Sequence, residues 1–337
     1  MHALVVTNMY PTPDIPQAGA FIAAQVESLR SRGVKVDLLH LARAQGRDVY
    51  RGLGRKVKRL VSELEPDLIH VMYGGVMADA VTRALPHRPV LVSFCGTDLL
   101  AGTADGVVKR LALRYGAFAS RRAARRAAGI IVKSRNLFDA LPPEVDKSRV
   151  WIVPNGVDTA QFRPLDRAEC QRRLGWDPDR HHVLFPAPPT RPEKRYSLAR
   201  ASVELVSASG RPAELHALTG VRHEDVPIWL NAANVVILTS THEGSPNAVK
   251  EALACNVPLV SVDVGDVRER IAGIDGCFIA APDAQDLADK LGRALERDEP
   301  TDGRRRIAEL SVERVAAQVG EIYASLTNGA VGASREL

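Results

Sequence analysis

The sequence predicts an α/β protein of two domains, each built on a parallel β-sheet with crossover helices. Short apolar runs alternate with helical patterns along the chain, which is the order expected of parallel strands joined by helices. The 337 residues exceed what one ordinary hydrophobic core supports, so we expect two domains. The composition, 45% hydrophobic and 25% charged, is typical of a globular protein.

The first domain is expected to span residues 1–162. Its helix over 20–32 ends at Gly33, since glycine commonly follows the last helical residue. A turn is expected at Pro154-Asn155-Gly156 because of its residue types, and the periodicity breaks near Phe162. The expected strands are residues 3–7, 34–40, 68–72, 90–94, 129–133 and 150–153.

The second domain is expected to span residues 163–317, followed by a last helix and tail over 318–337. The helical pattern itself begins near residue 311, and residues 327–337 resemble a frayed terminus. The expected strands are residues 182–185, 213–218, 235–238, 259–262 and 276–279, with a helix over 284–297.

Two carboxylates, Glu243 and Glu251, bracket a strand-to-helix turn in the segment 239–254. Glu243 follows the apolar run 235–238, at the carboxyl end of a strand, where open α/β sheets bind ligands. Glu251 lies about two turns into the following helix. Both side chains can therefore point toward one crevice.

The residues between these carboxylates allow a ligand to approach the backbone at a helix start. Carboxylates bind hydroxyl groups and amides bind anionic oxygens, so the segment suits a sugar joined to a diphosphate. A capped surface helix with two solvated acids is the alternative. The candidate donor-binding residues here are Gly244, Ser245, Pro246, Asn247 and Ala248.

This segment resembles the E-x7-E motif of the retaining GT-B-fold glycosyltransferases of family four. Residues 66–70 resemble the family's P-D-x-I-H stretch, and residues 153–158 with Phe162 resemble its P-N-G-V-D…F signature. Residues 1–32 look like its first strand, loop and helix. The matches occur in the family's order and cover most of the chain.

The resemblance implies a GT-B fold of two facing Rossmann-like domains, with the last helix packing back on the N-terminal, acceptor-side domain. It implies retaining transfer of a hexose from a nucleotide diphosphate sugar, UDP-linked, to a glycan, lipid-linked or small-molecule acceptor. Bacterial polysaccharide and teichuronic-acid enzymes are members. No cofactor or metal is implied, and the cysteines and histidines show no metal-ligand cluster along the chain.

By the same resemblance, Glu243 holds the donor sugar and Glu251 the ribose. Lys194 matches the lysine that neutralises the departing diphosphate, a role fixed cations can fill. The family's arginine lies five positions before that lysine, whereas Arg191 lies three before. For Arg191 a solvated basic loop therefore remains the alternative.

Further donor contacts come from two loops. Gly19 matches one of the family's paired glycines in the first loop, residues 10–20, where amides can face a phosphate. A proline-stiffened loop is the alternative. The usual V-x-G-x-G loop is missing, and residues 214–221, which end in Gly220 and Val221, stand in its place. These two are the expected contacts for the base.

On the acceptor side, Cys95, Gly96 and Asp98 resemble the family's H-G-x-D stretch, with Cys95 where histidine is common. A helix N-cap is the alternative for Asp98. The resemblance also implies that Asn155 lies at the interdomain cleft, near the acceptor side. His70 follows an apolar run and is read as either a core or a functional histidine.

Charge is distributed unevenly. Residues 1–165 hold 24 Lys and Arg against 14 Asp and Glu, so the first domain is expected to meet an anionic partner. A basic helix is expected over 109–126, interrupted near Gly116. Its expected partner is an anionic acceptor or an anionic membrane surface on the cytoplasmic side. The alternative is a solvated helix surface in an enzyme with a soluble acceptor. The cysteines are expected to be reduced thiols of a cytoplasmic protein.

Two rival functions stay open. One is another GT-B enzyme, such as a nucleotide-sugar epimerase or a phosphorylase. The other is a non-enzymatic protein that binds anionic ligands or nucleic acid, which a pI near 9.1 allows. Aromatic residues make up only 5% of the chain and no nucleic-acid module is recognised, so no nucleic-acid partner is expected.

Overall fold

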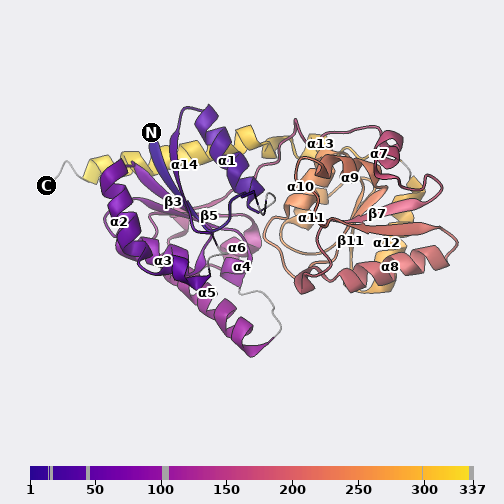
Figure 1. Cartoon of the computed structure of the whole chain (residues 1–337), viewed down its shortest axis with the longest axis horizontal. Helices are drawn as coiled ribbons and strands as arrows, with labels where there is room; N and C mark the ends of the chain where they lie inside the picture. The colour runs from indigo at the N-terminus through magenta and orange to yellow at the C-terminus, as the bar shows by residue number, and fades with distance from the viewer. Residues whose placement is uncertain (14, 16–17, 43–45, 101–105, 298, 334–337) are drawn as a thin grey trace. The chain divides into compact units, whose positions relative to one another are not determined.

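The protein consists of two compact units (Figure 1). The structure, a computed structural model, describes residues 1–13, 15, 18–42, 46–100, 106–297 and 299–333. Unit 1 comprises Met1–Gly156 together with the chain from Val312 onward, and unit 2 comprises Val157–Ser311.

Unit 1 is built on a six-stranded, all-parallel sheet in the order β2-β1-β3-β4-β5-β6. The strands are β1 (His2–Thr7), β2 (Lys35–His40), β3 (Leu68–Met72), β4 (Val90–Phe94), β5 (Gly129–Val132) and β6 (Val150–Ile152). The helices are α1 (Ala20–Ser31), α2 (Leu53–Leu64), α3 (Gly75–Ala84), α4 (Thr97–Leu100), α5 (Val107–Arg126), α6 (Arg135–Asp139) and α14 (Val312–Ala333).

Helices cover both faces of this sheet because alternate strand residues point to opposite sides. Val5 belongs to a core cluster with Ile22 of α1 and Tyr323 of α14. Val6, its neighbour on β1, belongs to a second cluster with Val57 of α2. Figure 1 shows α14 and α1 in the same part of unit 1, so the last helix of the chain packs beside the first.

His70 is a core residue of unit 1. Its Nδ1 lies 2.7 Å from the Tyr323 hydroxyl and its Nε2 lies 2.7 Å from Ser93 Oγ. Burial lowers the pKa of His70 to about 3, so the ring is neutral. The sequence left open whether His70 is a core or a functional histidine. The core interpretation explains the hydrogen-bond partners of both ring nitrogens, which join β3 to β4 and to α14.

Unit 2 is built on a five-stranded parallel sheet in the order β11-β10-β9-β7-β8. The strands are β7 (His181–Phe185), β8 (Ala213–Ala217), β9 (Val235–Leu238), β10 (Leu259–Val262) and β11 (Cys277–Ala280). The helices are α7 (Arg167–Leu174), α8 (Tyr196–Ala208), α9 (Val226–Ala232), α10 (Asn247–Ala254), α11 (Val267–Ile271), α12 (Ala284–Arg297) and α13 (Gly303–Arg306).

This sheet is also covered on both faces. Val183 of β7 packs in one cluster with residues of α8 and α12. Leu184, the next residue, packs in another with Leu230 of α9 and Leu253 of α10. β8 is an edge strand of this sheet and, among the described residues, pairs with β7 alone.

The units divide between Gly156 and Val157 rather than after residue 162. Phe162 is buried in the core of unit 2, and Val157 forms a β-bridge with Ser311 in the same unit. The residue taken from the sequence as a break in periodicity is therefore an anchor of the second core.

Two helices also differ from expectation. α14 begins at Val312 and continues to Ala333, where the sequence suggested a boundary at residue 318 and a frayed tail from 327. Residues 334–337 of that tail lie outside the described residues. α5 runs through Gly116 without interruption, because one glycine costs a helix only about 1 kcal/mol.

Candidate active site

Lys194 and Glu243 meet at the carboxyl edge of the sheet of unit 2. Lys194 ends a short 3-10 helix, Pro192–Lys194, that follows β7, and Glu243 lies in the loop between β9 and α10. The two strands are neighbours, so the loops emerge side by side. The Lys194 ammonium donates a hydrogen bond to the Glu243 carboxylate.

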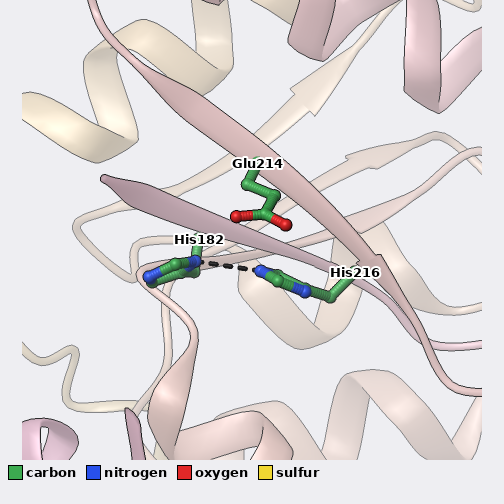
Figure 2. Close-up of side chains that lie close together, drawn as sticks. All are labelled: His182, Glu214 and His216. Atoms are coloured by element: carbon green, nitrogen blue, oxygen red, sulfur yellow. Dashed lines mark hydrogen bonds between the residues drawn. The ribbon is translucent and has the colours of Figure 1, made fainter. Parts of the chain in front are cut away.

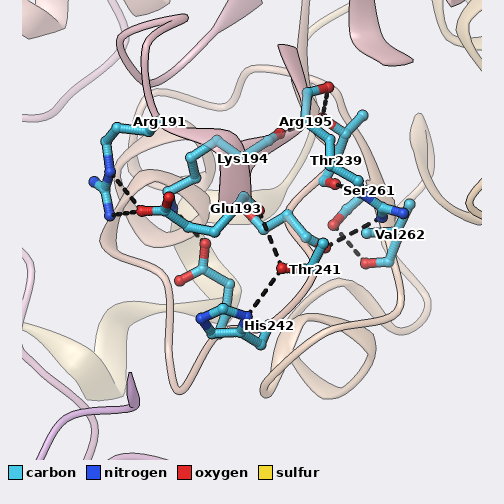
Figure 3. A network of polar contacts seen from close by, with 11 residues as sticks. Arg191, Glu193, Lys194, Arg195, Thr239, Thr241, His242, Ser261 and Val262 are labelled. Carbon is cyan, nitrogen blue, oxygen red and sulfur yellow. Dashed lines mark hydrogen bonds and ion pairs between the residues drawn. The ribbon is translucent and has the colours of Figure 1, made fainter. Parts of the chain in front are cut away.

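Backbone contacts hold these two loops together (Figure 3). The Thr239 hydroxyl donates to the carbonyl of Lys194 at 2.7 Å, and Arg195 Nε donates to the Thr239 carbonyl at 2.5 Å. The amide of Thr241 donates to the carbonyl of Glu193 at 2.8 Å. Lys194 and Glu243 are therefore presented by a cross-linked pair of loops.

Arg191 points elsewhere. Its guanidinium contacts Glu193 Oε1, with Nε at 2.8 Å and the terminal nitrogen at 2.7 Å, as Figure 3 shows. Partial burial raises the pKa of Glu193, but a hydrogen bond from its own backbone amide, together with the hydrogen bond and charge of Arg191, lowers that pKa on balance. The structure brings Lys194 and Glu243 together but pairs Arg191 with Glu193.

The start of α10 is fixed from its other side. Gly244, Ser245 and Pro246 are buried, and Ser245 Oγ donates to Asp266 Oδ2 at 2.8 Å. A Cβ on Gly265 would lie 2.3 Å from the Gly244 carbonyl oxygen, so only glycine fits there. The loop that leads into α10 is thus held in place by its contacts with Gly265 and Asp266. The amides of the first helical turn, at Asn247 and Ala248, follow this loop, and amides at a helix start attract anions.

Glu251 lies further along α10 and contacts a residue that the sequence analysis missed. His223 Nε2 is 3.5 Å from Glu251 Oε1, and this contact raises the pKa of His223. The His223 ring meets the Phe162 ring edge-on at 5.3 Å. No spacing signal pointed to His223, which follows the missing glycine-rich loop.

The same loop carries Gly220 and Val221. Gly220 is exposed with φ of 69°, a left-handed conformation that favours glycine. Val221 packs partly buried against the core cluster of α9 and α10. The loop after β8 thus approaches α10 through His223 and Val221.

In unit 1, Asp98 organises the loops after β3 and β4. Its carboxylate accepts hydrogen bonds from the amides of Gly74 (2.7 Å), Cys95 (3.0 Å) and Gly96 (2.7 Å). Burial raises the pKa of Asp98 even though these hydrogen bonds lower it. The side chain thereby fixes Cys95 and Gly96 at the carboxyl end of β4. It accepts more hydrogen bonds than the single helix N-cap bond that the sequence suggested as the alternative.

Lys133 was read from the sequence only as the end of a strand. It follows β5 and is 1% exposed, and its Nζ has no hydrogen-bond partner among the described residues. Burial lowers its pKa, while the nearby Cys95 and Asp98 raise it. A lysine directly after an apolar strand is the signal that could have drawn attention to it.

Gly19 and Asn155 lie at the carboxyl edge of the same sheet. Gly19 has φ of 68° and caps α1, and a Cβ there would lie 2.5 Å from the Met9 carbonyl oxygen. Residues 14, 16 and 17 of this loop lie outside the described residues. Asn155 is buried after β6. The candidate residues of unit 1 therefore gather where parallel sheets bind ligands.

Two Rossmann-like units with polar residues at their carboxyl edges define a GT-B protein. A model of "Glycosyltransferase Family 4" matches residues 18–161, and a model of "Glycosyl transferases group 1" matches residues 194–297. The Bacillus subtilis protein TuaC, named as a glycosyltransferase of teichuronic acid biosynthesis, is 24% identical over 87% of this chain and 89% of its own.

Solved structures share the fold. Sucrose-phosphate synthase of Thermosynechococcus elongatus has a TM-score of 0.75 at 17% identity, covering 98% of this chain and all of that one. HepE of Anabaena, in complex with UDP, has a TM-score of 0.64 at 17% identity, covering 96% of this chain and all of HepE. The chain belongs to the GT-B glycosyltransferases of family four.

Proposed function

We propose that this glycosyltransferase moves a hexose from a UDP-linked sugar to an acceptor with retention of anomeric configuration and without a metal ion. The ion pair of Lys194 and Glu243 beside the start of α10 carries the proposal. It puts a cation and a carboxylate within one ligand's reach, as a sugar diphosphate requires.

Each residue has a role in this proposal. Glu243 accepts hydrogen bonds from the donor sugar, and Glu251 accepts them from the ribose. Lys194 and the amides of residues 245–248 bind the diphosphate, and Arg191 joins them by leaving Glu193. When the anomeric C–O bond breaks, the leaving diphosphate takes the electron pair, and these donors stabilise the charge that develops.

The remaining candidates have supporting roles. Gly220 and Val221 contact the base, and Gly19 offers backbone amides to the donor. Cys95, Gly96, Asp98 and Asn155 line the acceptor side. Because Asp98 is occupied by three amides, its contribution is to position the loop rather than to exchange protons.

A thermal-shift screen with UDP-, GDP- and ADP-sugars tests the donor, because a ligand that binds the folded state raises the melting temperature. The wild type is expected to respond to UDP-sugars, and Glu251→Ala to respond weakly. Glu204→Ala, which changes an exposed carboxylate on α8, is the matched control. No response to any nucleoside diphosphate sugar would overturn the proposal.

The rival enzymes are separated by incubation with donor alone. A nucleotide-sugar epimerase changes the sugar without an acceptor, whereas a glycosyltransferase leaves its configuration unchanged. A phosphorylase would require inorganic phosphate for turnover. Salt-dependent DNA binding would be the mark of a nucleic-acid binder.

We further propose that α5 docks the protein on an anionic lipid surface, where a lipid-linked acceptor would be found. Five apolar residues along its first three turns are exposed: Val107, Val108, Leu111, Tyr115 and Phe118. In Figure 1 this end of α5 extends beyond the other helices of unit 1. In the described part of the chain no helix has the length and apolarity to cross a bilayer.

The exposed cations of α5 favour a surface of anionic lipid. Lys109, Arg110 and Arg114 are exposed among these apolar residues, and each cation near an anionic bilayer contributes about 1 kcal/mol. Three of the cations further along α5 are already engaged, because Arg122 and Arg126 pair with Asp79 at 3.4 and 2.8 Å and Arg125 pairs with Glu144 at 3.5 Å. The first half of α5, rather than the arginines of its second half, therefore carries the docking surface.

A further inference from the structure

Two histidines and a glutamate converge on one face of the sheet of unit 2 (Figure 2). His182 lies on β7 and pairs in register with Glu214 on β8. His216 lies two residues beyond Glu214, and residues two apart on a strand share a face. One potential ligand atom from each side chain lies within 4.8 Å of the other two. The three residues form no cluster along the sequence, because only the pairing of β7 with β8 brings them together.

The orientation of His182 leaves one nitrogen available as a ligand. Its Nε2 lies 2.8 Å from the Asp177 carbonyl oxygen, which can only accept a hydrogen bond, so Nε2 carries the proton. Nδ1 therefore presents a lone pair, and it points at His216 Nε2, 2.9 Å away. A backbone carbonyl that orients the far nitrogen is the usual second contact of a metal-binding histidine.

His216 is held in place by an aromatic neighbour. The Trp176 ring stacks on it with centroids 3.7 Å apart and planes 10° apart, and Trp229 meets Trp176 edge-on at 5.6 Å. Burial lowers the pKa of both histidines, His216 to about 4. Glu214 is exposed and supplies negative charge from the edge strand.

We propose that His182 Nδ1, His216 Nε2 and the Glu214 carboxylate bind a divalent transition-metal ion of the zinc type. Two imidazoles and a carboxylate are a common zinc ligand set, with water in the fourth position. Zn–N bonds of about 2.0–2.1 Å in tetrahedral geometry place the nitrogens about 3.3 Å apart. The rings would therefore separate slightly, and the His216 proton would move from Nε2 to Nδ1.

This site is separate from the proposed donor site. His182 lies near the start of β7, whereas Lys194 follows the end of that strand. A bound ion would fasten the edge strand β8 to β7 and, through Asp177, to the turn after α7. Its expected effect is on the stability of unit 2, and its test needs no glycosyl transfer.

The test is zinc binding to the tag-free, full-length protein after EDTA treatment and buffer exchange, measured by calorimetry. The wild type is expected to bind one Zn²⁺ per chain, and Co²⁺ in its place is expected to quench tryptophan fluorescence through Trp176. His216→Gln should abolish binding, and Glu214→Gln should weaken it at least about tenfold, the lower limit for losing even an outer contact. His181→Gln, on the opposite face of β7, should bind as the wild type does.

Glu214→Gln keeps the test decisive if a histidine variant fails to fold, because Glu214 is exposed. Equal melting temperatures without metal would show that this variant folds normally. Absence of stoichiometric Zn²⁺ binding by the wild type would overturn the proposal. Equal Zn²⁺ affinity in the wild type, Glu214→Gln and His216→Gln would also overturn it. His182 and His216 would then be only a neutral, hydrogen-bonded pair.

Discussion

Lys194 and Glu243 form an ion pair although 49 positions separate them in the sequence. Their side chains are 15% and 16% exposed, so the pair is shielded yet reachable by a ligand. The pair exists because β7 and β9 are neighbours in the sheet, which brings their following loops together. It places the ammonium of Lys194 beside the carboxylate of Glu243, as the proposed binding of a sugar diphosphate requires.

Glu243→Gln should reduce turnover about a hundredfold, the scale of an error in substrate positioning. Affinity for UDP should change little, because the amide oxygen can still accept a hydrogen bond from Lys194. Turnover is measured as UDP release from the donor, and affinity by calorimetry. A parallel fall in UDP affinity and turnover would contradict the assignment of Glu243 to the sugar.

EDTA should leave the turnover number of the enzyme unchanged, because we propose that Lys194 and the amides at the start of α10, rather than a metal ion, stabilise the leaving diphosphate. If the zinc site on β7 and β8 is occupied, EDTA should lower the melting temperature instead. Rates and melting curves recorded on the same sample separate the two effects. Complete loss of turnover that Mg²⁺ or Mn²⁺ restores would refute the metal-free mechanism.

The contact between His223 and Glu251 should stabilise the protein at acidic rather than alkaline pH. Glu251 raises the pKa of His223 above 6.5. The stabilisation is therefore fully present below the unfolded pKa and is lost as pH rises through the folded pKa. The loss of unfolding free energy in His223→Gln should be larger at pH 5.5 than at pH 8.5, as measured by urea denaturation.

Glu251→Gln is the matched control for this pH effect. It keeps the shape of the side chain but removes the charge, so the pH dependence contributed by His223 should largely disappear. A His223→Gln difference that grew toward alkaline pH would show that the histidine is not stabilised as a cation.

Liposome co-sedimentation tests docking through α5. Binding should require anionic lipid, fall with added salt, and drop when Lys109, Arg110 and Arg114 are changed to alanine. Leu111→Ser combined with Phe118→Ser should weaken it as well. Arg200→Ala, an exposed change on α8 of unit 2, is the control.

Changing Arg122 or Arg126 is a poor test of docking, because either substitution removes a partner of Asp79, which is largely buried. Binding that ignores lipid charge, or no binding at low salt, would leave an enzyme with a soluble acceptor.

The sequence predicted the strands well because buried parallel strands are short apolar runs with distinct limits. The strands Leu68–Met72, Val90–Phe94, Val235–Leu238 and Leu259–Val262 have the expected bounds. The division between the units was misplaced because Phe162 looks like a loop residue locally, whereas its burial depends on contacts formed only in unit 2.

Site residues within one segment were easier to predict than those joined by folding. Glu243 and Glu251 share a motif, but the contact of Glu251 with His223 depends on the path of the loop after β8. The burial of Lys133 and the meeting of His182 with His216 likewise depend on strand order. Local patterns do not contain that information.

The central claim is that Lys194 recognises the diphosphate of the donor and Glu251 its ribose. Calorimetry with UDP and UMP, using the wild type, Lys194→Ala and Glu251→Ala, tests it most directly. Lys194→Ala should weaken UDP binding about ten- to a hundredfold, as expected for a charged hydrogen bond, and UMP binding much less. Glu251→Ala should weaken both nucleotides equally. If Lys194→Ala bound UDP normally, or lost UDP and UMP affinity to the same extent, the account of this site would be wrong.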